Sequence, residues 1–480
     1  MLDLDVYVDY RTSLSLVGTI LKYLGLAPLF SAAVALYYGE SLLPFLITTV
    51  AMVAAGSARP VRSRRRRADP VNALFESMSG FTTTGSTVLG EISFERHSRS
   101  VLMWRQFTQW LGGMGILVLM VAILPELSVG GAQIIRQEAP GISIEKLTPR
   151  IRETASALWK IYFGFTVVAV GAYYGLYLTG VAPEMDFYNA VAHALTTMPT
   201  GGFSPEARSI EAFAPVVQWA VMPFMVIAGT NFALFWYVLR GKPRRLTRNS
   251  EFRSYLLAMW VVGALLSVLL FTGFGLEELP TNVGPLSGDL ENSLRQALFQ
   301  TVAIVTTTGY ASMDFNTWDQ SAQVVLLLAM FLGGSAGSAS GSIKIIRWYV
   351  VGETMSRELF TSVHPEAVRP VRISEGAIDE DTIQSIFVFV LIFVSIFAVS
   401  TVVVFVDGFR QELDLSAIEA MSVATATLGN IGPGFGEVGP MDSFGRFSDA
   451  GKLYMVFLMW IGRLEILTVL VVLTPSYWRR

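Results

Sequence analysis

Short phrases rich in glycine and threonine interrupt an otherwise apolar sequence. One reads "SGFTTTGST" at residues 79–87, and nearly the same letters return as "VTTTGYA" at residues 305–311. Backbone carbonyls and threonine hydroxyls can together replace the hydration shell of a monovalent cation. Glycine supplies the backbone angles that such a loop requires. These residue types therefore point to the coordination of a monovalent cation.

Alignment on these phrases gives four copies of one unit. The copies are residues 73–87, 190–204, 297–311 and 420–434, and one glycine falls in register in each: Gly85, Gly202, Gly309 and Gly432. A single Gly/Thr turn could merely pack two helices together, but four turns in register favour one shared site. The residues predicted to line an ion filter are Thr83, Thr84, Gly85, Thr200, Gly201, Gly202, Thr307, Thr308, Gly309, Asn430, Ile431 and Gly432.

The elements that position these loops are expected to lie in a membrane. Of 480 residues, 52% are hydrophobic and 15% are charged, whereas soluble domains carry about 25% charged residues. Runs that reach or approach the roughly 20 apolar residues of a membrane helix occur at Leu14–Tyr37, Val101–Leu124, Leu158–Leu178, Val216–Leu239, Tyr255–Phe274, Val324–Leu332, Ile383–Val406 and Lys452–Leu473. We therefore expect a multi-pass protein of the cell membrane.

Basic residues are sorted among the loops. They cluster at Arg240, Lys242, Arg244, Arg245 and Arg248, at Arg136, Lys146, Arg150 and Arg152, and at Arg357, Arg369 and Arg372. The stretch 276–292 is acidic and has no basic residue. Because positively charged loops stay cytoplasmic, we expect the basic loops inside and the acidic one outside. This orientation places the four Gly/Thr phrases on the outer side.

The sequence offers little for enzymatic chemistry. It has no cysteine, which excludes thiolate metal sites and cysteine nucleophiles. His97, His193 and His364 lie far apart without ligand spacing and are expected at the surface or at helix caps. An enzyme would also need nucleophile–base pairs or metal clusters within the spans. We therefore predict that the protein is not an enzyme.

Each phrase follows a short, weakly apolar segment and precedes a long apolar span. Backbone at membrane depth must be buried or must line a water-filled cavity, so four such loops predict a pseudo-fourfold ring around a central path. The expected fold class is an all-α polytopic membrane protein with four span–pore helix–filter loop–span repeats. The predicted segments are 1–57 (an N-terminal helix pair), 58–154, 155–250, 251–375 and 376–480 (repeats one to four).

Two further features lie in predicted spans. The stretch "GGSAGSASG" (Gly333–Gly341) interrupts repeat three and cannot form a stable helix, since each glycine costs about 1 kcal/mol. We expect a flexible plug, the alternative being close helix packing through small residues. Arg463 and Glu465 lie within the final span, where a charge is costly and is a functional candidate. The alternative is that this arginine pairs with a carboxylate to fix the packing of the repeats.

With these motifs in view, the chain resembles the TrkH/TrkG/KtrB superfamily of potassium uptake proteins over nearly its whole length. Further stretches similar to that superfamily are "WRQFTQWLGGMGI" (104–116), "RQEAPG" (136–141), "KLTPRIRETA" (146–155), "GGSAGSASGSIKIIRW" (333–348) and "MWIGRLEILT" (459–468). The additional N-terminal helix pair is more similar to the TrkH branch.

The resemblance implies roles and partners. It makes the Gly/Ser stretch an intramembrane gate beneath the filter, with predicted gate residues Gly333, Gly334, Ser335, Ala336, Gly337, Ser338, Gly341, Lys344 and Arg463. It implies potassium as the transported ion with no covalently bound cofactor, a homodimer, and a cytosolic TrkA-like nucleotide-binding regulatory subunit. Related plant HKT transporters that carry sodium have a serine at the first filter glycine, so glycine at all four positions favours potassium.

Repeat one departs from the superfamily pattern. Only "ARPVRSRRRRADPVN", with six arginines, separates Ser57 from Ala73, and a first span of about thirty residues is missing. The leading hypothesis is a gated potassium-uptake pore. The alternatives are a less selective sodium/potassium or proton-coupled symporter, and a non-transporting homologue that lacks the span.

Overall fold

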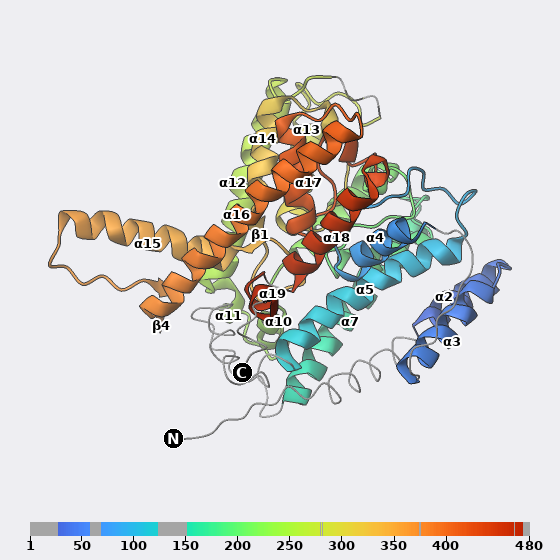
Figure 1. Ribbon diagram of the computed structural model, residues 1–480, viewed down its shortest axis with the longest axis horizontal. Coiled ribbons are helices and arrows are strands. Elements are labelled where there is room, and N and C mark those ends of the chain that lie inside the picture. The colour runs from blue at the N-terminus through green and yellow to red at the C-terminus, as the bar shows by residue number, and fades with distance from the viewer. Residues whose placement is uncertain are drawn as a thin grey trace. The chain divides into compact units, whose positions relative to one another are not determined.

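The computed structural model describes residues 27–57, 69–122, 151–278, 280, 282–373, 376–464 and 466–473, and in these residues the chain is mostly helical. It forms two compact units (Figure 1). The first comprises Met1–Pro70 and Ile92–Arg105, and the second comprises Val71–Glu91 and Gln106–Arg480. The predicted division into a helix pair and four repeats stays a prediction.

In the first unit, α2 (Pro28–Tyr38) packs against α3 (Leu43–Ser57). Glu40, in the turn between them, accepts hydrogen bonds from the backbone N–H groups of Arg99 at 2.7 Å and Ser100 at 2.9 Å. Burial acts to raise the pKa of Glu40, but hydrogen bonds from Ser100 and Arg99 lower it below its ordinary value. The turn is thereby tied to the start of α5 (Arg99–Ala122).

The longer helices of the second unit include three that are long and apolar enough to cross a membrane: α7 (Ile151–Leu178), α12 (Ser250–Thr272) and α16 (Glu380–Arg410). The other helices there are α9 (Pro215–Ala228), α10 (Phe232–Leu239), α11 (Arg244–Thr247), α14 (Gln320–Ala329), α15 (Ile345–Val363), α18 (Asp449–Arg463) and α19 (Ile466–Leu473). These lengths and compositions agree with a multi-pass membrane protein.

One run that we expected to be a single span is broken. The run Val216–Leu239 divides into α9 and α10, which are bent by 97°. The break falls at Gly229–Asn231, where the Asn231 side chain accepts a hydrogen bond from Ala233 N–H and starts a new helix. The expectation of one continuous helix was therefore wrong here. The run Lys452–Leu473 contains α18 and α19, and Glu465 between them lies outside the described residues.

Four short helices precede the Gly/Thr phrases, as the sequence predicts. They are α4 (Pro70–Phe81), α8 (Phe187–Thr197), α13 (Leu290–Val305) and α17 (Ala417–Leu428), each too short to span a bilayer. Three begin with a side-chain cap, from Asp186, Asp289 and Ser416. Figure 1 shows α17 beside α16 and α18, which it contacts.

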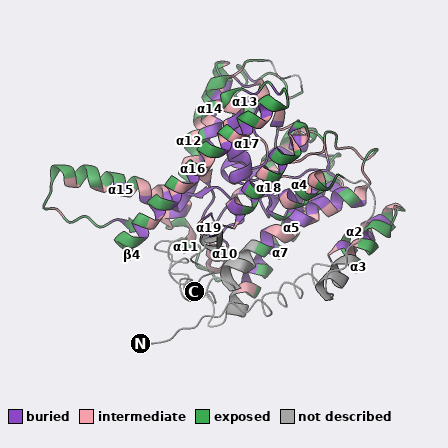
Figure 2. Ribbon diagram, in the orientation of Figure 1, coloured by how far each residue is buried: buried purple, intermediate pink, exposed green. Residues whose placement is uncertain are grey.

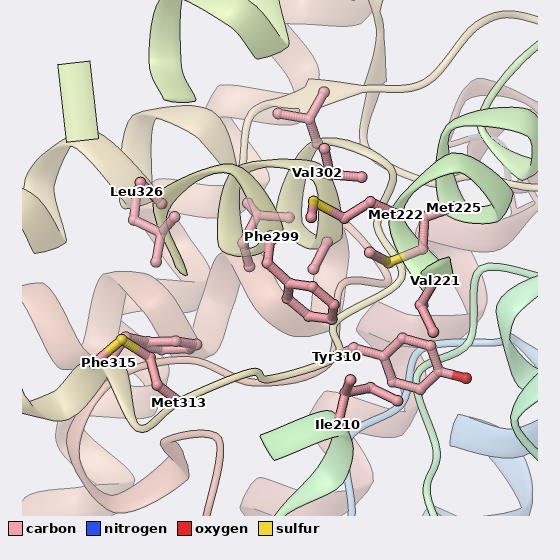
Figure 3. Packing of buried hydrophobic residues seen from close by; sticks show 14 of the residues in the cluster. Ile210, Val221, Met222, Met225, Phe299, Val302, Tyr310, Met313, Phe315 and Leu326 are labelled. Carbon is pink, nitrogen blue, oxygen red and sulfur yellow. The ribbon is translucent and has the colours of Figure 1, made fainter. Parts of the chain in front are cut away.

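The short helices α8, α13 and α17 are buried along most of their length. Figure 2 shows the contrast between the largely buried α17 and the exposed far end of α15. The largest apolar cluster surrounds α13, and Figure 3 shows Phe299, Val302 and Tyr310 of this segment among Val221, Met225 and other cluster members. Burial of polar backbone at the ends of these helices requires that its hydrogen bonds be satisfied internally.

Helix α3 ends at Ser57 and α4 begins at Pro70, so only residues 58–69 connect them, of which 58–68 are outside the described part. Twelve residues cannot cross a bilayer as a helix, which needs about 20. The shortened connection inferred from the sequence therefore lies between these two helices.

Candidate cation-binding site

The four short helices end in the same unusual backbone conformation. Two or three residues after each helix, a residue adopts a left-handed conformation although none is glycine: Thr83, Thr200, Thr307 and Asn430 have φ of 53°, 56°, 55° and 52°. Two residues later comes a glycine that also has positive φ: Gly85, Gly202, Gly309 and Gly432, with φ of 88°, 75°, 72° and 111°. The four phrases therefore share one backbone pattern at the positions that were aligned from the sequence.

Hydrogen bonds explain why this conformation is stable. The N–H groups of Thr84, Gly201, Thr308 and Ile431 donate to carbonyls five residues earlier, at 2.8–2.9 Å. The N–H groups of the left-handed residues donate to carbonyls three residues earlier, at 2.9–3.4 Å. This is the Schellman pattern, which satisfies carbonyls at a helix end. The partly negative helix C-termini therefore end directly at the loops.

The four loops contact one another in a closed cycle. A Cβ added at Gly85 would overlap the carbonyl oxygen of Gly201, one at Gly202 that of Thr308, one at Gly309 that of Ile431, and one at Gly432 would lie 2.9 Å from that of Thr84. We call residues 83–85, 200–202, 307–309 and 430–432 the glycine ring. Both the positive φ and the crowding require glycine at the aligned positions.

The amide of Gln109 supports the second loop of the ring. Its Nε2 donates to the Gly201 carbonyl at 2.7 Å, and its Oε1 accepts from Phe203 N–H at 3.1 Å. A Cβ at Gly201 would overlap this amide. Glycine therefore replaces the threonine of loops one and three because Gln109 occupies the space. The motif "WRQFTQWLGGMGI" includes this glutamine, whose role the sequence did not indicate.

Side chains also tie the first loop to the fourth. Ser86 Oγ donates to the Gly432 carbonyl at 2.9 Å, and Asn430 Nδ2 donates to Thr84 Oγ1 and to the Met459 carbonyl, both at 2.9 Å. Within the described residues, Thr83 Oγ1 and Asn430 Oδ1 are buried without a hydrogen-bond partner. Buried oxygens without partners are expected where an ion or water is coordinated.

Tyr310 joins the third loop to α8. Its hydroxyl lies 2.5 Å from Thr196 Oγ1 and donates to the His193 carbonyl at 3.0 Å. His193 itself is fully buried, with Nδ1 2.8 Å from the Asn189 carbonyl and Nε2 3.0 Å from Ser204 Oγ. The expectation of a surface or cap histidine was wrong here, because both ring nitrogens find partners inside the protein.

The second candidate feature is the stretch 333–341, which we call the Gly/Ser loop. Its base is closed by parallel pairing of β1 (Leu332–Gly333) with β2 (Ile343–Lys344). It lies in the break between α9 and α10, where Ser335 N–H donates to the Gly229 carbonyl at 2.8 Å. Nearly the whole loop is buried. The predicted flexibility of the Gly/Ser loop stays a prediction. In the observed conformation the loop is extensively hydrogen-bonded.

The Gly/Ser loop touches the glycine ring directly. Gly341 N–H donates to Thr307 Oγ1 at 2.7 Å, and a Cβ at Gly341 would overlap the carbonyl oxygen of Gly429, the residue before Asn430. The Gly/Ser loop therefore contacts the third and fourth segments of the glycine ring. It does so on the side of the ring where the short helices α13 and α17 end.

Buried charges hold the Gly/Ser loop in place. Arg463, 7% exposed, donates from Nη1 to the Ala339 carbonyl at 2.6 Å, and Lys344 Nζ donates to the Ser340 carbonyl. Both predicted cations thus lie against the loop, whereas Glu465 is outside the described residues. A third charge, Glu251, also contacts the loop and was not predicted.

Acidic side chains gather on the loops that follow the ring. Burial raises the pKa of Glu211, with Asp314 adding to the shift and Arg208 opposing it. Burial, Asp314 and Glu437 raise the pKa of Asp442. The negative potential of these groups would concentrate cations near the ring.

Comparisons with known proteins agree with this geometry. The TrkH family model, described as a cation transport protein, matches residues 20–480. The Trk system potassium uptake protein TrkH of Vibrio parahaemolyticus is 33% identical, covering 98% of this chain and 100% of its own length. TrkG of Escherichia coli is 31% identical over 85% of this chain and 79% of its own. The crystal structure of the potassium transporter TrkH from Vibrio parahaemolyticus superposes with a TM-score of 0.81, at 30% identity over 98% of this chain and 100% of that one.

The alignment with the Vibrio relative extends over 512 positions, whereas this chain has 480 residues, so at least 32 positions are occupied by the relative alone.

Proposed function

Because the chain belongs to the TrkH family of cation transport proteins, we propose that it takes up potassium ions across the cell membrane through the glycine ring. Members of this family are ion transporters and not enzymes. The observation that carries the proposal is the closed cycle of four loops in which each aligned glycine faces the carbonyl of the next repeat. The relatives named above are potassium uptake proteins by name.

The ring would bind a cation through the residues predicted from the sequence. Its carbonyls and threonine hydroxyls replace hydration oxygens, and the C-termini of four short helices direct partial negative charge toward the ion. Potassium is the transported substrate in this proposal, and glycine at all four positions supports it over sodium. Loops two and four, which have Gly201 and Ile431 in place of a threonine, support only moderate selectivity.

The Gly/Ser loop would act as the gate. Contact between Gly341 and Thr307 puts the loop against the ring, and Arg463 and Lys344 stabilise it there. A cation that leaves the ring on this side meets a buried segment, so conduction requires the loop to move. We assign regulation of this movement to a cytosolic TrkA-like subunit, and we propose that the transporter is a homodimer, both by analogy with the family.

A non-transporting homologue is the second candidate. The observation that favours it is the connection of only twelve residues between α3 and α4. A proton-coupled or less selective symporter would keep the ring and differ only in coupling.

Uptake of rubidium by a bacterium that lacks its own potassium uptake systems tests the proposal. Cells that express the protein should take up rubidium and grow on low potassium, and Gly309→Ser should reduce influx or shift it toward sodium. Absence of uptake despite normal membrane expression, with and without a TrkA-like subunit, would favour the non-transporting homologue.

A further inference from the structure

Glu251 is a buried carboxylate that contacts the Gly/Ser loop. It lies in the first turn of α12 and is 1% exposed. One carboxylate oxygen, Oε1, accepts a hydrogen bond from the backbone N–H of Ala336 at 2.6 Å. A hydrogen bond to an ionised acceptor is about twice as strong as a neutral one. Glu251 therefore holds the loop at Ala336, whereas Arg463 and Lys344 donate to the carbonyls of Ala339 and Ser340.

The burial of this carboxylate needs an explanation, because a charge without compensation is costly away from water. The N-terminus of α12, capped by Asn249, favours a negative charge in its first turn. Lys344 lies within Coulombic reach of the carboxylate. The remaining oxygen, Oε2, has no hydrogen-bond partner among the described residues. Ala336 N–H is thus the one hydrogen-bond donor that the described structure gives to Glu251.

Charges of opposite sign hold the two halves of the loop. Glu251, on α12, accepts from an N–H group at Ala336, and Arg463, on α18, donates to the carbonyl of Ala339 at 2.6 Å. Each charge is matched to the backbone group that it contacts. The turn from Ala336 to Ala339 is therefore held at both ends by helices that belong to different predicted repeats.

We propose that Glu251 is a positioning residue that latches the Gly/Ser loop in its blocking conformation. This inference rests on the proposed function, because it assumes that the loop blocks conduction through the glycine ring. In the latched state, the Ala336 hydrogen bond and the Arg463 hydrogen bond act together. Loss of the first leaves the loop held at one side only, and the open state becomes more populated, while the ring is unchanged.

Single-channel recording of the purified protein in lipid bilayers tests this latch. Glu251→Gln removes the charge with little change in size but keeps an oxygen that can accept from Ala336 N–H, so it weakens this hydrogen bond and should raise the open probability about threefold to tenfold. Unitary conductance and the potassium-to-sodium permeability ratio should not change, because the ring is not touched. Glu366→Gln, at an exposed carboxylate, is the matched control and should behave as the unaltered protein.

Ala336→Pro removes the same hydrogen bond from the donor side and guards against misfolding of one variant. It should also raise the open probability, and in combination with Glu251→Gln the two effects should not add. If the unaltered protein conducts and neither variant changes the open probability, the latch is overturned while the proposed function stands. A changed permeability ratio would also overturn it, since that result would give Glu251 a role in the ring. An unaltered protein that does not conduct even with a TrkA-like subunit present contradicts the proposed function itself.

Discussion

The glycine ring and the Gly/Ser loop are both glycine-rich backbone inside a membrane protein, but different forces hold them. In the ring, each loop repeats the same hydrogen bonds to its own preceding helix. The Gly/Ser loop depends on contacts from distant parts of the chain: the α9–α10 break, α12, α18 and Thr307. Local hydrogen bonds make a conformation that persists, whereas a few long-range contacts make one that can be released.

This difference predicts opposite outcomes for mutations. Damage to the ring should lower or abolish cation transport, because no alternative backbone offers the same oxygens. Damage to the contacts of the Gly/Ser loop should raise basal transport, because the blocking conformation loses support. The following substitutions test this contrast.

The largest effect is expected for Gly309→Ala. A Cβ there would overlap the carbonyl oxygen of Ile431, and the left-handed conformation costs an alanine about 1–2 kcal/mol in addition. We expect rubidium influx to fall by about tenfold or more, measured at equal membrane expression. Gly171→Ala, on α7 with nothing within 4 Å of the added Cβ, is the control and should leave influx unchanged. Equal influx in both variants would contradict the assignment of the ring.

A large effect of opposite sign is expected for Arg463→Gln. The change removes the charge that holds the Ala339 carbonyl, so the Gly/Ser loop should leave its blocking position more often. Basal rubidium influx should rise roughly tenfold, the factor for a lost hydrogen bond to a charged group. Arg446→Gln, at an exposed arginine that pairs with Glu437, serves as the control. Reduced influx from a correctly folded variant would argue against a gate at this loop.

A smaller change, in selectivity, is expected for Gln109→Leu. Without the amide, the Gly201 carbonyl and Phe203 N–H lose their hydrogen bonds, and the second loop becomes less regular. We expect the potassium-to-sodium permeability ratio to fall about threefold to tenfold, consistent with one weakened hydrogen-bonded support. Gln411→Leu, at an exposed residue after α16, is the control. A ratio equal to that of the unaltered protein would show that loop two does not depend on Gln109.

The smallest effect is expected for Asp442→Asn, outside both features. The raised pKa of Asp442 means that its charged form is less favourable in the folded than in the unfolded state. The asparagine should therefore stabilise the protein by roughly 0.3 kcal/mol at neutral pH. This gain should vanish as the pH falls below the ordinary aspartate pKa, where both states bind the proton. Thermal unfolding in detergent at pH 7 and at about pH 3 measures it, and a gain that is larger at the lower pH would contradict the assignment.

The repeated part of the molecule could be predicted from its sequence because the information is local. A helix end followed by a left-handed residue and a glycine recurs in four phrases, and their alignment on Gly85, Gly202, Gly309 and Gly432 agrees with the observed backbone. The short helices before them are too short to span a membrane, which also follows from length alone.

Long-range features could not be predicted in the same way. Asn231 looks like one polar residue in an apolar run, yet it starts a new helix and breaks a predicted span. His193 gave no sign that Asn189 and Ser204 would satisfy it inside the protein. Glu251 follows a basic loop and resembles an ordinary helix-start carboxylate, and only the fold brings it to Ala336.

The central claim is that the glycine ring binds the transported cation. Anomalous diffraction from crystals of the protein grown in thallium(I), which scatters strongly and substitutes for potassium, measures this directly. We expect anomalous peaks enclosed by Gly85, Gly202, Gly309 and Gly432, and we expect them to weaken in Gly309→Ala. Well-ordered crystals with no peak inside the ring, or with peaks only elsewhere, would contradict the claim.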